Sequence, residues 1–428
     1  MASMTESELG RVLLTHRGVQ WIIGTKDDPY ALLLRAADDD PHRLGELIRE
    51  RGSLYWSSAE AWVTGRHEVA AAALDDPRLS FRHPDADVPA SDGEGEQREP
   101  MPWEVPALRE ILPFDAMFLT AGRADCERVR ELLEPLLGVK ALERWRPAAE
   151  GALRRALTAA GDEFDLRADV ADVFAADLVR EILGVPEEDR DRFAALCRGG
   201  AGALDAMVCS PHLRTAHDLI TAVEGMRSLL TDLIGQRRAK PGDDLVSALL
   251  TATHEDEVRS VCTLLALVGS ELSATLFCDA VAALLDHPGT WRALCENPGL
   301  APAVVDETLR YAPPVRLVPL YAREELVLAG IVVPAGSQVV VALEAAGRDP
   351  AVHAEPAVFD PATERGGRHL AFSAGLPTSL LAPLVRLQAE SGLRLLTAEA
   401  PGARRTGPVL RRLRSGVTGA VLELPLAR

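Results

Sequence analysis

The last of the six cysteines in this 428-residue chain is Cys295, so the remainder of the chain contains none. The six are scattered and form no C-x-x-C pair. This pattern predicts reduced thiols in a cytoplasmic protein and excludes a cysteine zinc site. The part of the chain after Cys295 therefore has no thiolate to offer to a metal or cofactor.

Aromatic and basic residues are also scarce. Aromatic residues make up 4% of the chain, which leaves little material for stacking nucleobases. Lysine and arginine number 46 against 64 acidic residues, and the formal net charge is -18. Nucleic acids and anionic membranes would both repel such a chain, so we expect neither as a partner. A protein or a neutral small molecule is favoured.

Several functional signals are missing. The chain has no P-loop, no G-x-S-x-G motif and no H-E-x-x-H motif. Its N-terminus lacks a basic start followed by an apolar run, which predicts a cytoplasmic protein without an export signal. Two uncharged stretches, 326–343 and 369–385, carry glycine and proline in their middles, which argues against membrane spans.

Helical periodicity dominates what is present. Apolar residues recur at three-to-four spacing in ten segments: 43–51, 65–74, 125–137, 140–160, 169–183, 190–197, 216–238, 256–285, 291–295 and 303–311. Segment 256–285 is almost wholly apolar, which predicts one long helix through the core. Strand-like segments are few: 53–63, 325–328, 331–333 and 339–343. We expect a mainly α fold with a small β portion, in a single domain over 1–428, with an exposed acidic loop at 83–100.

Segment 369–387 reads HLAFSAGLPTSLLAPLVRL and resembles, without a gap, the haem-thiolate loop of bacterial cytochrome P-450 monooxygenases. The resemblance implies the fold of that family. The cysteine of the loop falls on Ser379, whose hydroxyl is a hard, protonated oxygen. The family's oxygen chemistry needs a soft anionic sulfur on the iron, so the resemblance implies a cytochrome P-450 fold that lacks the haem-ligating cysteine.

Other segments resemble the same family in the same order. Glu307 and Arg310 match its E-x-x-R helix, and the spacing places carboxylate and guanidinium on one helical face. Arg348 stands where the family completes this pair, so we expect a structural brace in which two arginines hold Glu307. Segments 183–189 and 243–250 are further matches.

The positions that contact haem in the family depart from its pattern. A propionate donor falls on Pro377, and an H-x-x-x-R motif falls on Cys126 and Arg130, so only the arginine remains. Another propionate arginine falls on Leu320. The alcohol that helps to deliver protons to oxygen falls on Leu272, beside Glu271. The resemblance therefore implies no cofactor, no metal and no catalytic residue in a degenerate monooxygenase scaffold.

A narrower resemblance is to haem-less cytochrome P-450-like auxiliary proteins from actinomycete antibiotic pathways. It rests on both ends of the chain, including Asp28-Pro29-Tyr30 and Gly407-Pro408-Val409. These proteins activate glycosyltransferases that attach deoxyaminosugars to macrolide and anthracycline aglycones. The resemblance implies a non-catalytic activator that forms a 2:2 complex with a glycosyltransferase.

The N-terminal segment 1–35 is a candidate partner-binding segment, because tryptophan and tyrosine are favoured interface anchors. The candidate interface residues are Leu13, Arg17, Trp21 and Tyr30. Packing of this segment on its own domain is the alternative. Arginines between 404 and 414 form a basic cluster, for which a solvated face is the simplest interpretation.

Two other functions stay open. The first is a monooxygenase with an unconventional haem ligand, for which His353 and His369 are the candidates and Glu271 a candidate acid. The second is a small-molecule carrier that uses the emptied haem cavity.

Overall fold

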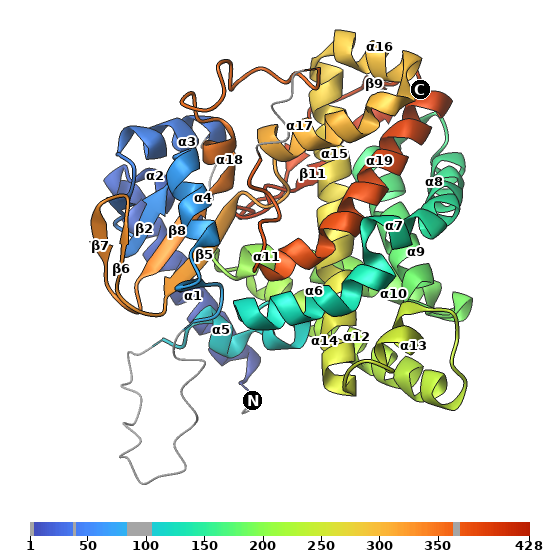
Figure 1. Ribbon diagram of the computed structural model, residues 1–428, viewed down its shortest axis with the longest axis horizontal. Helices are drawn as coiled ribbons and strands as arrows, with labels where there is room; N and C mark the ends of the chain where they lie inside the picture. The colour runs from blue at the N-terminus through green and yellow to red at the C-terminus, as the bar shows by residue number, and fades with distance from the viewer. Residues whose placement is uncertain (1–3, 37–39, 84–104, 363–368) are drawn as a thin grey trace.

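The computed structural model describes residues 4–36, 40–83, 105–362 and 369–428, which form a helix-rich half and a sheet-rich half (Figure 1). Buried apolar side chains from Leu9 to Leu426 form one contiguous cluster. The predicted fold class, mainly α with a small β portion, is confirmed. Of the predicted acidic loop at 83–100, residues 84–100 lie outside the described residues.

The helix-rich half is built from amphipathic helices. Its principal helices are α6 (Arg123–Leu137), α7 (Val139–Leu142), α8 (Arg146–Ala160), α9 (Asp172–Leu183), α10 (Arg190–Gly200), α11 (Ala203–Ala206), α12 (Leu213–Ala239), α13 (Leu245–Leu249), α16 (Pro288–Glu296), α17 (Ala301–Tyr311) and α19 (Ala382–Glu399). The prediction of one helix over 140–160 was wrong. The chain makes a 3-10 turn at Glu143–Trp145 before α8 begins, since Pro147 has no N–H and fits only the first turn of a helix.

A continuous helix from Glu255 to Asp286 crosses the core, as predicted. It consists of α14 (Glu255–Thr263), a π-helical turn (Leu264–Gly269) and α15 (Ser270–Asp286). By length and composition it would suffice to cross a membrane, but the whole of its most apolar window is buried inside the fold. It is therefore the core helix of this fold.

The sheet-rich half contains a five-stranded sheet in the order β1-β2-β8-β5-β3. Its strands are β1 (Tyr55–Trp56), β2 (Ala61–Thr64), β3 (Leu79–Ser80), β5 (Leu317–Ala322) and β8 (Gln338–Ala342). A separate hairpin pairs β6 (Leu326–Leu328) with β7 (Ile331–Val333). Short helices pack around the sheet: α2 (Pro29–Arg35), α3 (Pro41–Glu50), α4 (His67–Asp75) and α18 (Leu343–Gly347). The predicted strand 53–63 is a hairpin, in which β1 and β2 pair antiparallel around a turn.

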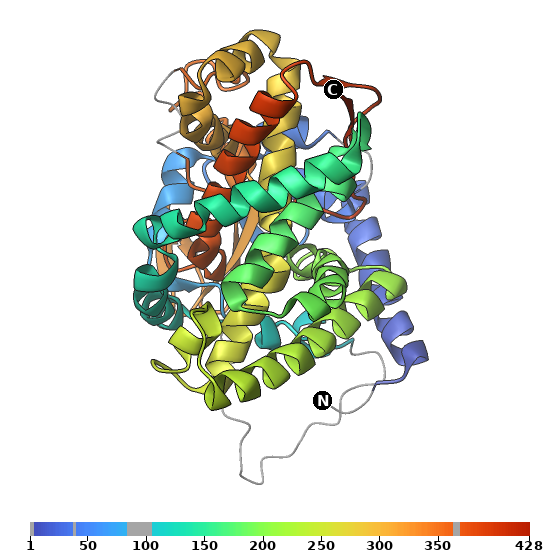
Figure 2. The same cartoon turned by 90° about the vertical axis from the view of Figure 1, so that its right-hand side faces the viewer.

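The N-terminal segment forms α1 (Glu6–Ile23), which the helical periodicity above did not reveal. A capping box starts this helix, in which the Glu8 backbone N–H donates to Thr5 Oγ1 and the Thr5 backbone N–H donates to Glu8 Oε2. Figure 2 shows α1, in dark blue, at the edge of the molecule. The T-x-x-E spacing was the available signal.

The C-terminal segment returns across the molecule. Strand β12 (Pro425–Ala427) pairs with β4 (Glu163–Asp165) and β9 (Arg404–Arg405), while β10 (Leu410–Arg411) pairs with β11 (Val421–Glu423). We call residues 409–420 the C-terminal strap. Asp205 of α11 anchors it, because its carboxylate accepts hydrogen bonds from Ser415 Oγ, the Val417 and Thr418 backbone N–H groups and Thr418 Oγ1, all at 2.8–3.0 Å.

Candidate functional site

Ser379 lies in the short helix Pro377–Leu381 that leads into α19, and its hydroxyl is fully engaged by protein atoms. It donates to the Leu376 carbonyl at 2.5 Å and accepts from Arg130 Nη2 at 2.6 Å. Arg130 is the arginine that remains from the H-x-x-x-R motif on α6. A side chain that would face a haem propionate in the family thus contacts the residue at the thiolate position directly.

The residues around this position do not fit a haem-thiolate site. A Cβ on Gly269 of the central helix would lie 3.5 Å from Leu381 Cδ2 and 3.6 Å from Leu384 Cδ2. A Cβ at position 269 would thus be in ordinary van der Waals contact with two leucines at the start of α19. Leu381 and Leu384 therefore lie close to the central helix directly after Ser379, and the residue at the ligand position is a serine in place of a soft anionic thiolate.

The other departures from the family pattern are buried. Pro377, Leu320 on β5 and Leu272 on α15 are all buried and offer no donor to a propionate. Burial raises the pKa of the Cys126 thiol to about 12, so Cys126 is a neutral residue on the buried face of α6. These side chains pack as core residues.

Glu271, the candidate acid on the central helix, is held by two arginines. Arg167 Nη2 lies 2.5 Å from Glu271 Oε2, and Arg412 Nη2 of the strap lies 3.1 Å from Oε1. Burial alone would raise the pKa of Glu271, but the two guanidinium groups hold it below its ordinary value. Glu271 is an ionised partner in a structural network, so it is poorly suited to delivering protons.

The histidines considered as iron ligands have other neighbours. The His353 ring packs edge-on against His67 of the sheet-rich half, with centroids 6.1 Å apart. His369 lies near Asp306 of α17, and burial together with Arg386 lowers its pKa to about 4.

The predicted brace forms around Arg310, with one correction. Arg310 is fully buried, donates to both carboxylate oxygens of Glu307 at 2.7 and 2.8 Å, and donates to three backbone carbonyls of 347–358. The prediction that Arg348 also binds Glu307 was wrong, since Arg348 donates to the Tyr311 carbonyl at 3.0 and 3.1 Å. Glu307 instead accepts from the Asp360 backbone N–H at 2.9 Å, so a backbone donor takes the place of the second arginine.

Only part of the predicted interface is accessible. Leu13 and Tyr30 are 0% and 1% exposed, so the prediction that they contact a partner was wrong. Arg17 is half-buried and bonded to His212 Nδ1 at 2.6 Å. Trp21 is 57% exposed, and Arg35 lies over its ring at 5.3 Å. Four apolar side chains of α1 are exposed: Leu14, Val19, Trp21 and Ile22. Three of them, Leu14, Trp21 and Ile22, share the outward face of the helix, and we call these three the α1 patch.

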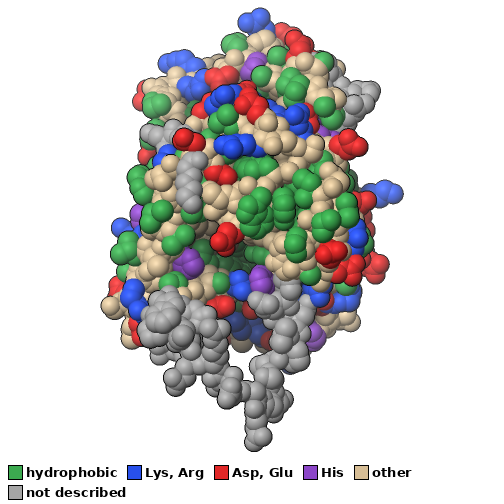
Figure 3. Space-filling view, turned by 90° about the vertical axis from the view of Figure 1, so that its left-hand side faces the viewer, with side chains coloured by type: hydrophobic (Ala, Val, Ile, Leu, Met, Phe, Trp, Pro, Cys, Tyr) green, Lys and Arg blue, Asp and Glu red, His purple; other side chains and the backbone are tan. Residues whose placement is uncertain are grey.

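A second exposed apolar area lies on the sheet-rich half. Figure 3 shows hydrophobic side chains gathered on the face where the β6–β7 hairpin lies in Figure 1. Trp56 of β1 is 52% exposed and packs against Trp62, and Val327 and Val332 of the hairpin are 61% and 53% exposed.

Three of the C-terminal arginines pair with acidic residues of the core helix and do not form a purely solvated face. Arg411 Nη1 lies 2.9 Å from Asp279 of α15, and Arg405 pairs with Asp286 at the end of the same helix. With Arg412 on Glu271, these residues fasten the C-terminal segment to the core helix. Sequence reasoning missed this network, because its acidic partners lie more than a hundred residues away.

Two cavities open beside this network. One, of about 570 Å³, lies between α2, α3, the sheet and the strap. The other, of about 130 Å³, is polar and is lined by Arg167, Glu271 and Arg412 among others. Neither is lined by any of the five positions at which the haem contacts of the family are lost.

Known proteins resemble this chain over nearly its whole length. Protein AknT of Streptomyces galilaeus is 45% identical over 99% of this chain and 96% of its own length. A family sequence pattern described as cytochrome P-450 matches residues 241–376. The chain belongs to the cytochrome P-450 family. Protein DesVIII of Streptomyces venezuelae and protein TylM3 of Streptomyces fradiae are each 35% identical, over 99% and 98% of the chain and 95% and 93% of their own lengths.

Relatives named for a reaction also match. The 20-oxo-5-O-mycaminosyltylactone 23-monooxygenase of Streptomyces fradiae is 34% identical over 87% of this chain and 85% of its own length. Among solved structures, a cytochrome P-450 in complex with an acyl carrier protein that carries hexadecenoic acid superimposes with a TM-score of 0.78. It is 26% identical, and the match covers 91% of this chain and 98% of the other. The matches to AknT, DesVIII and TylM3 confirm the predicted likeness to the P-450-like auxiliary proteins of antibiotic biosynthesis.

Proposed function

We propose that this protein is a non-catalytic auxiliary subunit that binds and activates a glycosyltransferase. The partner would transfer a nucleotide-activated deoxyaminosugar to a polyketide aglycone. The observation that carries the proposal is the direct Arg130–Ser379 hydrogen bond, because it lies where a monooxygenase needs its haem and its thiolate. The chain keeps the P-450 fold without the parts that perform P-450 chemistry, and it acts without a cofactor.

The names of the relatives support a distinction between auxiliary proteins and monooxygenases within this family. AknT, DesVIII and TylM3 match the chain over at least 98% of its length, and their names state no reaction. The monooxygenase from the organism of TylM3 matches a smaller share and acts on a mycaminosylated tylactone, which is a glycosylated polyketide. We therefore place this chain with the relatives that are not named for an oxidation, in a pathway that adds sugars to polyketides.

The α1 patch is the docking surface that we propose for the transferase. Trp21 and Ile22 follow Leu14 by seven and eight residues along α1. The three side chains therefore share one helical face, opposite the buried Leu9 and Leu13. Three large apolar side chains exposed on one face of a helix are unusual for a free surface. Trp21 provides a rigid anchor, which Arg35 orients. With one α1 patch per chain and a dimeric transferase, the complex would be 2:2.

Activation requires no chemistry from this chain. Binding to the competent conformation of the transferase shifts its population toward that conformation. A differential binding free energy of about 3 kcal/mol raises a competent fraction of one per cent to more than half, since each 1.4 kcal/mol is a factor of ten. A net charge of -18 and a core helix whose most apolar window is buried inside the fold suit a cytoplasmic protein that docks on another protein.

The test is sugar transfer by the purified transferase with and without this chain. We expect transfer to depend on the chain, and the active sample to lack the visible absorbance band of haem. Equal rates with and without the chain would refute the activator function. A haem band that tracks the activity would instead support a monooxygenase with an unconventional ligand.

A further inference from the structure

Two arginines from distant segments converge beside the α1 patch. Arg17 belongs to α1 and Arg414 to the strap, and both are bonded to the short segment that precedes α12. Arg17 Nη1 donates to the Pro211 carbonyl at 3.5 Å and to His212 Nδ1 at 2.6 Å. Arg414 Nε donates to the Ser210 carbonyl at 3.1 Å. We call Arg17 and Arg414 the arginine pair.

No carboxylate neutralises the arginine pair within the described part of the chain. Every hydrogen bond that either guanidinium makes there ends on a backbone carbonyl, on His212 or on the Gln20 amide oxygen. Burial and the charge of Arg17 lower the pKa of Arg414, and no carboxylate opposes them. The other two arginines of the strap, by contrast, each lie within 3.1 Å of a carboxylate on α15. The pair is therefore an uncompensated positive charge on a chain whose net charge is -18.

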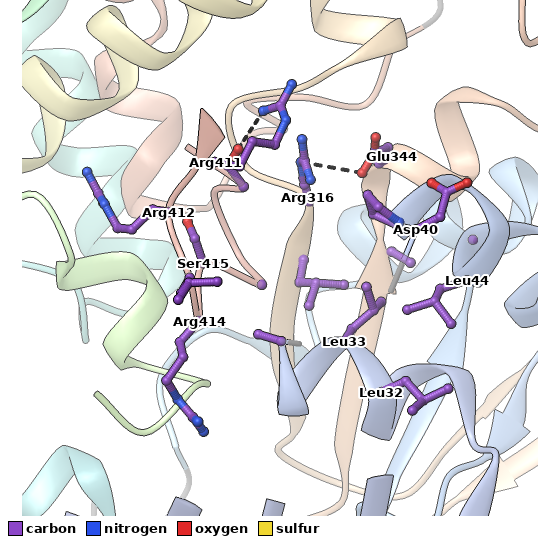
Figure 4. A pocket seen from close by; sticks show the side chains of 18 of the residues that line it. Leu32, Leu33, Asp40, Leu44, Arg316, Glu344, Arg411, Arg412, Arg414 and Ser415 are labelled. Atoms are coloured by element: carbon purple, nitrogen blue, oxygen red, sulfur yellow. Dashed lines mark hydrogen bonds and ion pairs between the residues drawn. The ribbon is translucent and has the colours of Figure 1, made fainter. Parts of the chain in front are cut away.

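Figure 4 shows how Arg414 is separated from the acidic residues of the larger cavity. Its side chain leaves the strap in the direction opposite to that of Arg411. Asp40 and Glu344 lie across the cavity from it. Arg414 Nη2 instead lies 3.4 Å from Gln20 Oε1 of α1. The charge of Arg414 is thus directed toward α1.

The arginine pair borders the α1 patch. Arg17 follows Leu14 by three residues and precedes Trp21 by four, and residues at these spacings are neighbours on a helix surface. On its other side Arg17 has the same spacings to the buried Leu13 and Gln20. Arg17 therefore lies between the patch and the face on which α1 packs, and a partner that covers Trp21 comes within reach of it.

Both side chains are positioned before a partner binds. Burial and the two guanidinium groups lower the pKa of His212, which keeps its ring neutral so that Nδ1 can accept from Arg17. The amide oxygen beside Arg414, Gln20 Oε1, also accepts from the Ser210 backbone N–H at 3.2 Å, so its place is fixed.

Each arginine keeps a donor for a partner. Arg17 Nη2 and Arg414 Nη1 donate to no acceptor among the described residues, and neither nitrogen is buried. Guanidinium donors form strong, charge-assisted hydrogen bonds with carboxylate oxygens. Because both side chains are already held, such a bond would cost little further side-chain entropy.

We propose that the arginine pair binds carboxylate side chains of the partner glycosyltransferase, beside the place where the transferase covers the α1 patch. The inference rests on the proposed function and names the chemistry of the transferase surface: an apolar hollow for Trp21 with acidic residues at its rim. Nucleic acids and anionic membranes are also negative, but the chain as a whole would repel them. Charge pairs at such a rim speed association and fix the orientation of the two proteins.

The test is the Kd of the transferase for the native chain and for Arg17→Glu and Arg414→Glu, measured at about 50 and about 500 mM NaCl. Each substitution replaces an attraction with a repulsion, so we expect each to weaken binding at least tenfold at the lower salt concentration. Because salt screens exposed charges, this difference from the native chain should shrink at least threefold at the higher concentration. Arg17→Gln, which removes the charge and keeps a polar side chain, should weaken binding by an intermediate factor.

Arg227→Glu is the matched control, because it makes the same change of charge away from the pair. Arg227 is exposed on α12, 15 residues after His212, which is about 22 Å along the helix. It should change Kd less than threefold. Arg17 and Arg414 variants that bind as tightly as this control, or a loss of affinity that is equally large at both salt concentrations, would overturn the proposal.

Two further measurements separate the remaining outcomes. If the native chain activates the transferase and the charge variants bind like the control, the arginine pair fails and the activator function stands; a native chain that neither binds nor activates would overturn both. Inorganic pyrophosphate titrated into the chain alone tests a phosphate-bearing ligand instead. We expect no submillimolar binding, and such binding that is lost in Arg17→Glu would overturn the assignment to the transferase.

Discussion

Replacing Trp21 with alanine should weaken the complex with the transferase about 30- to 300-fold. The Trp21 side chain is 57% exposed, and a tryptophan offers up to about 250 Å², so roughly 140 Å² is left for a partner to cover. At about 25 cal/mol per Å² this corresponds to an upper limit of about 3.5 kcal/mol, or about 300-fold in Kd. The lower limit is the roughly 2 kcal/mol of an ordinary hot spot.

The assay is a calorimetric or interferometric titration of the transferase with each variant. Trp56→Ala is the matched control, since Trp56 is 52% exposed and belongs to the other apolar area. We expect that control to change Kd less than threefold, and both variants to keep the native Tm within a few degrees. An unchanged Kd for Trp21→Ala would refute the α1 patch, and a loss confined to Trp56→Ala would move the interface to the sheet-rich half.

Three further outcomes follow from the buried groups. Arg310→Met leaves Glu307 and three backbone carbonyls without their donor, so it should lower the free energy of unfolding by about 3–5 kcal/mol. With about 2.1 cal/mol/K of unfolding entropy for each of 428 residues, calorimetry should record a Tm about 3–6 °C lower. A shift below 1 °C would contradict the brace. The pKa of His369 is lowered from 6.5 to about 4, so its contribution of about 3 kcal/mol to the free energy of unfolding is present above pH 6.5 and is lost as pH falls through 4. His369→Gln should therefore flatten this part of the curve of stability against pH in denaturant titrations. Parallel curves for the native chain and the variant would contradict this role of His369. Ser379→Cys alone should not restore haem binding, because Pro377, Cys126 and Leu320 still offer no donor to the propionates and Arg130 still contacts position 379; a haem band after reconstitution would contradict this.

The core of the fold was predictable because its signal is local. The apolar run at 256–285 is too long for a strand and too uniform for a surface helix, and it became the central helix. The Glu307–Arg310 pair was predictable for the same reason, since i, i+3 spacing places both side chains together whatever surrounds them.

The missed features depend on contacts between distant segments or on helix phase. The acidic partners of Arg411 and Arg412 lie on α15, so nothing near these arginines distinguishes a fastened strap from a solvated face. Trp21 and Tyr30 are both aromatic residues near the N-terminus, but they lie on different helices. The bounds of α1, which the Thr5–Glu8 capping box signals, would have placed Trp21 on the outward face; the burial of Tyr30 follows from the packing of α2 on the body.

The central claim is that this chain activates a glycosyltransferase without haem chemistry. Its most direct test is the rate of sugar transfer at fixed transferase concentration as the haem-free chain is titrated in. We expect a rate that rises from near zero and saturates at one chain per transferase subunit. A rate that is independent of the chain, or that rises only after haem is added, would contradict it.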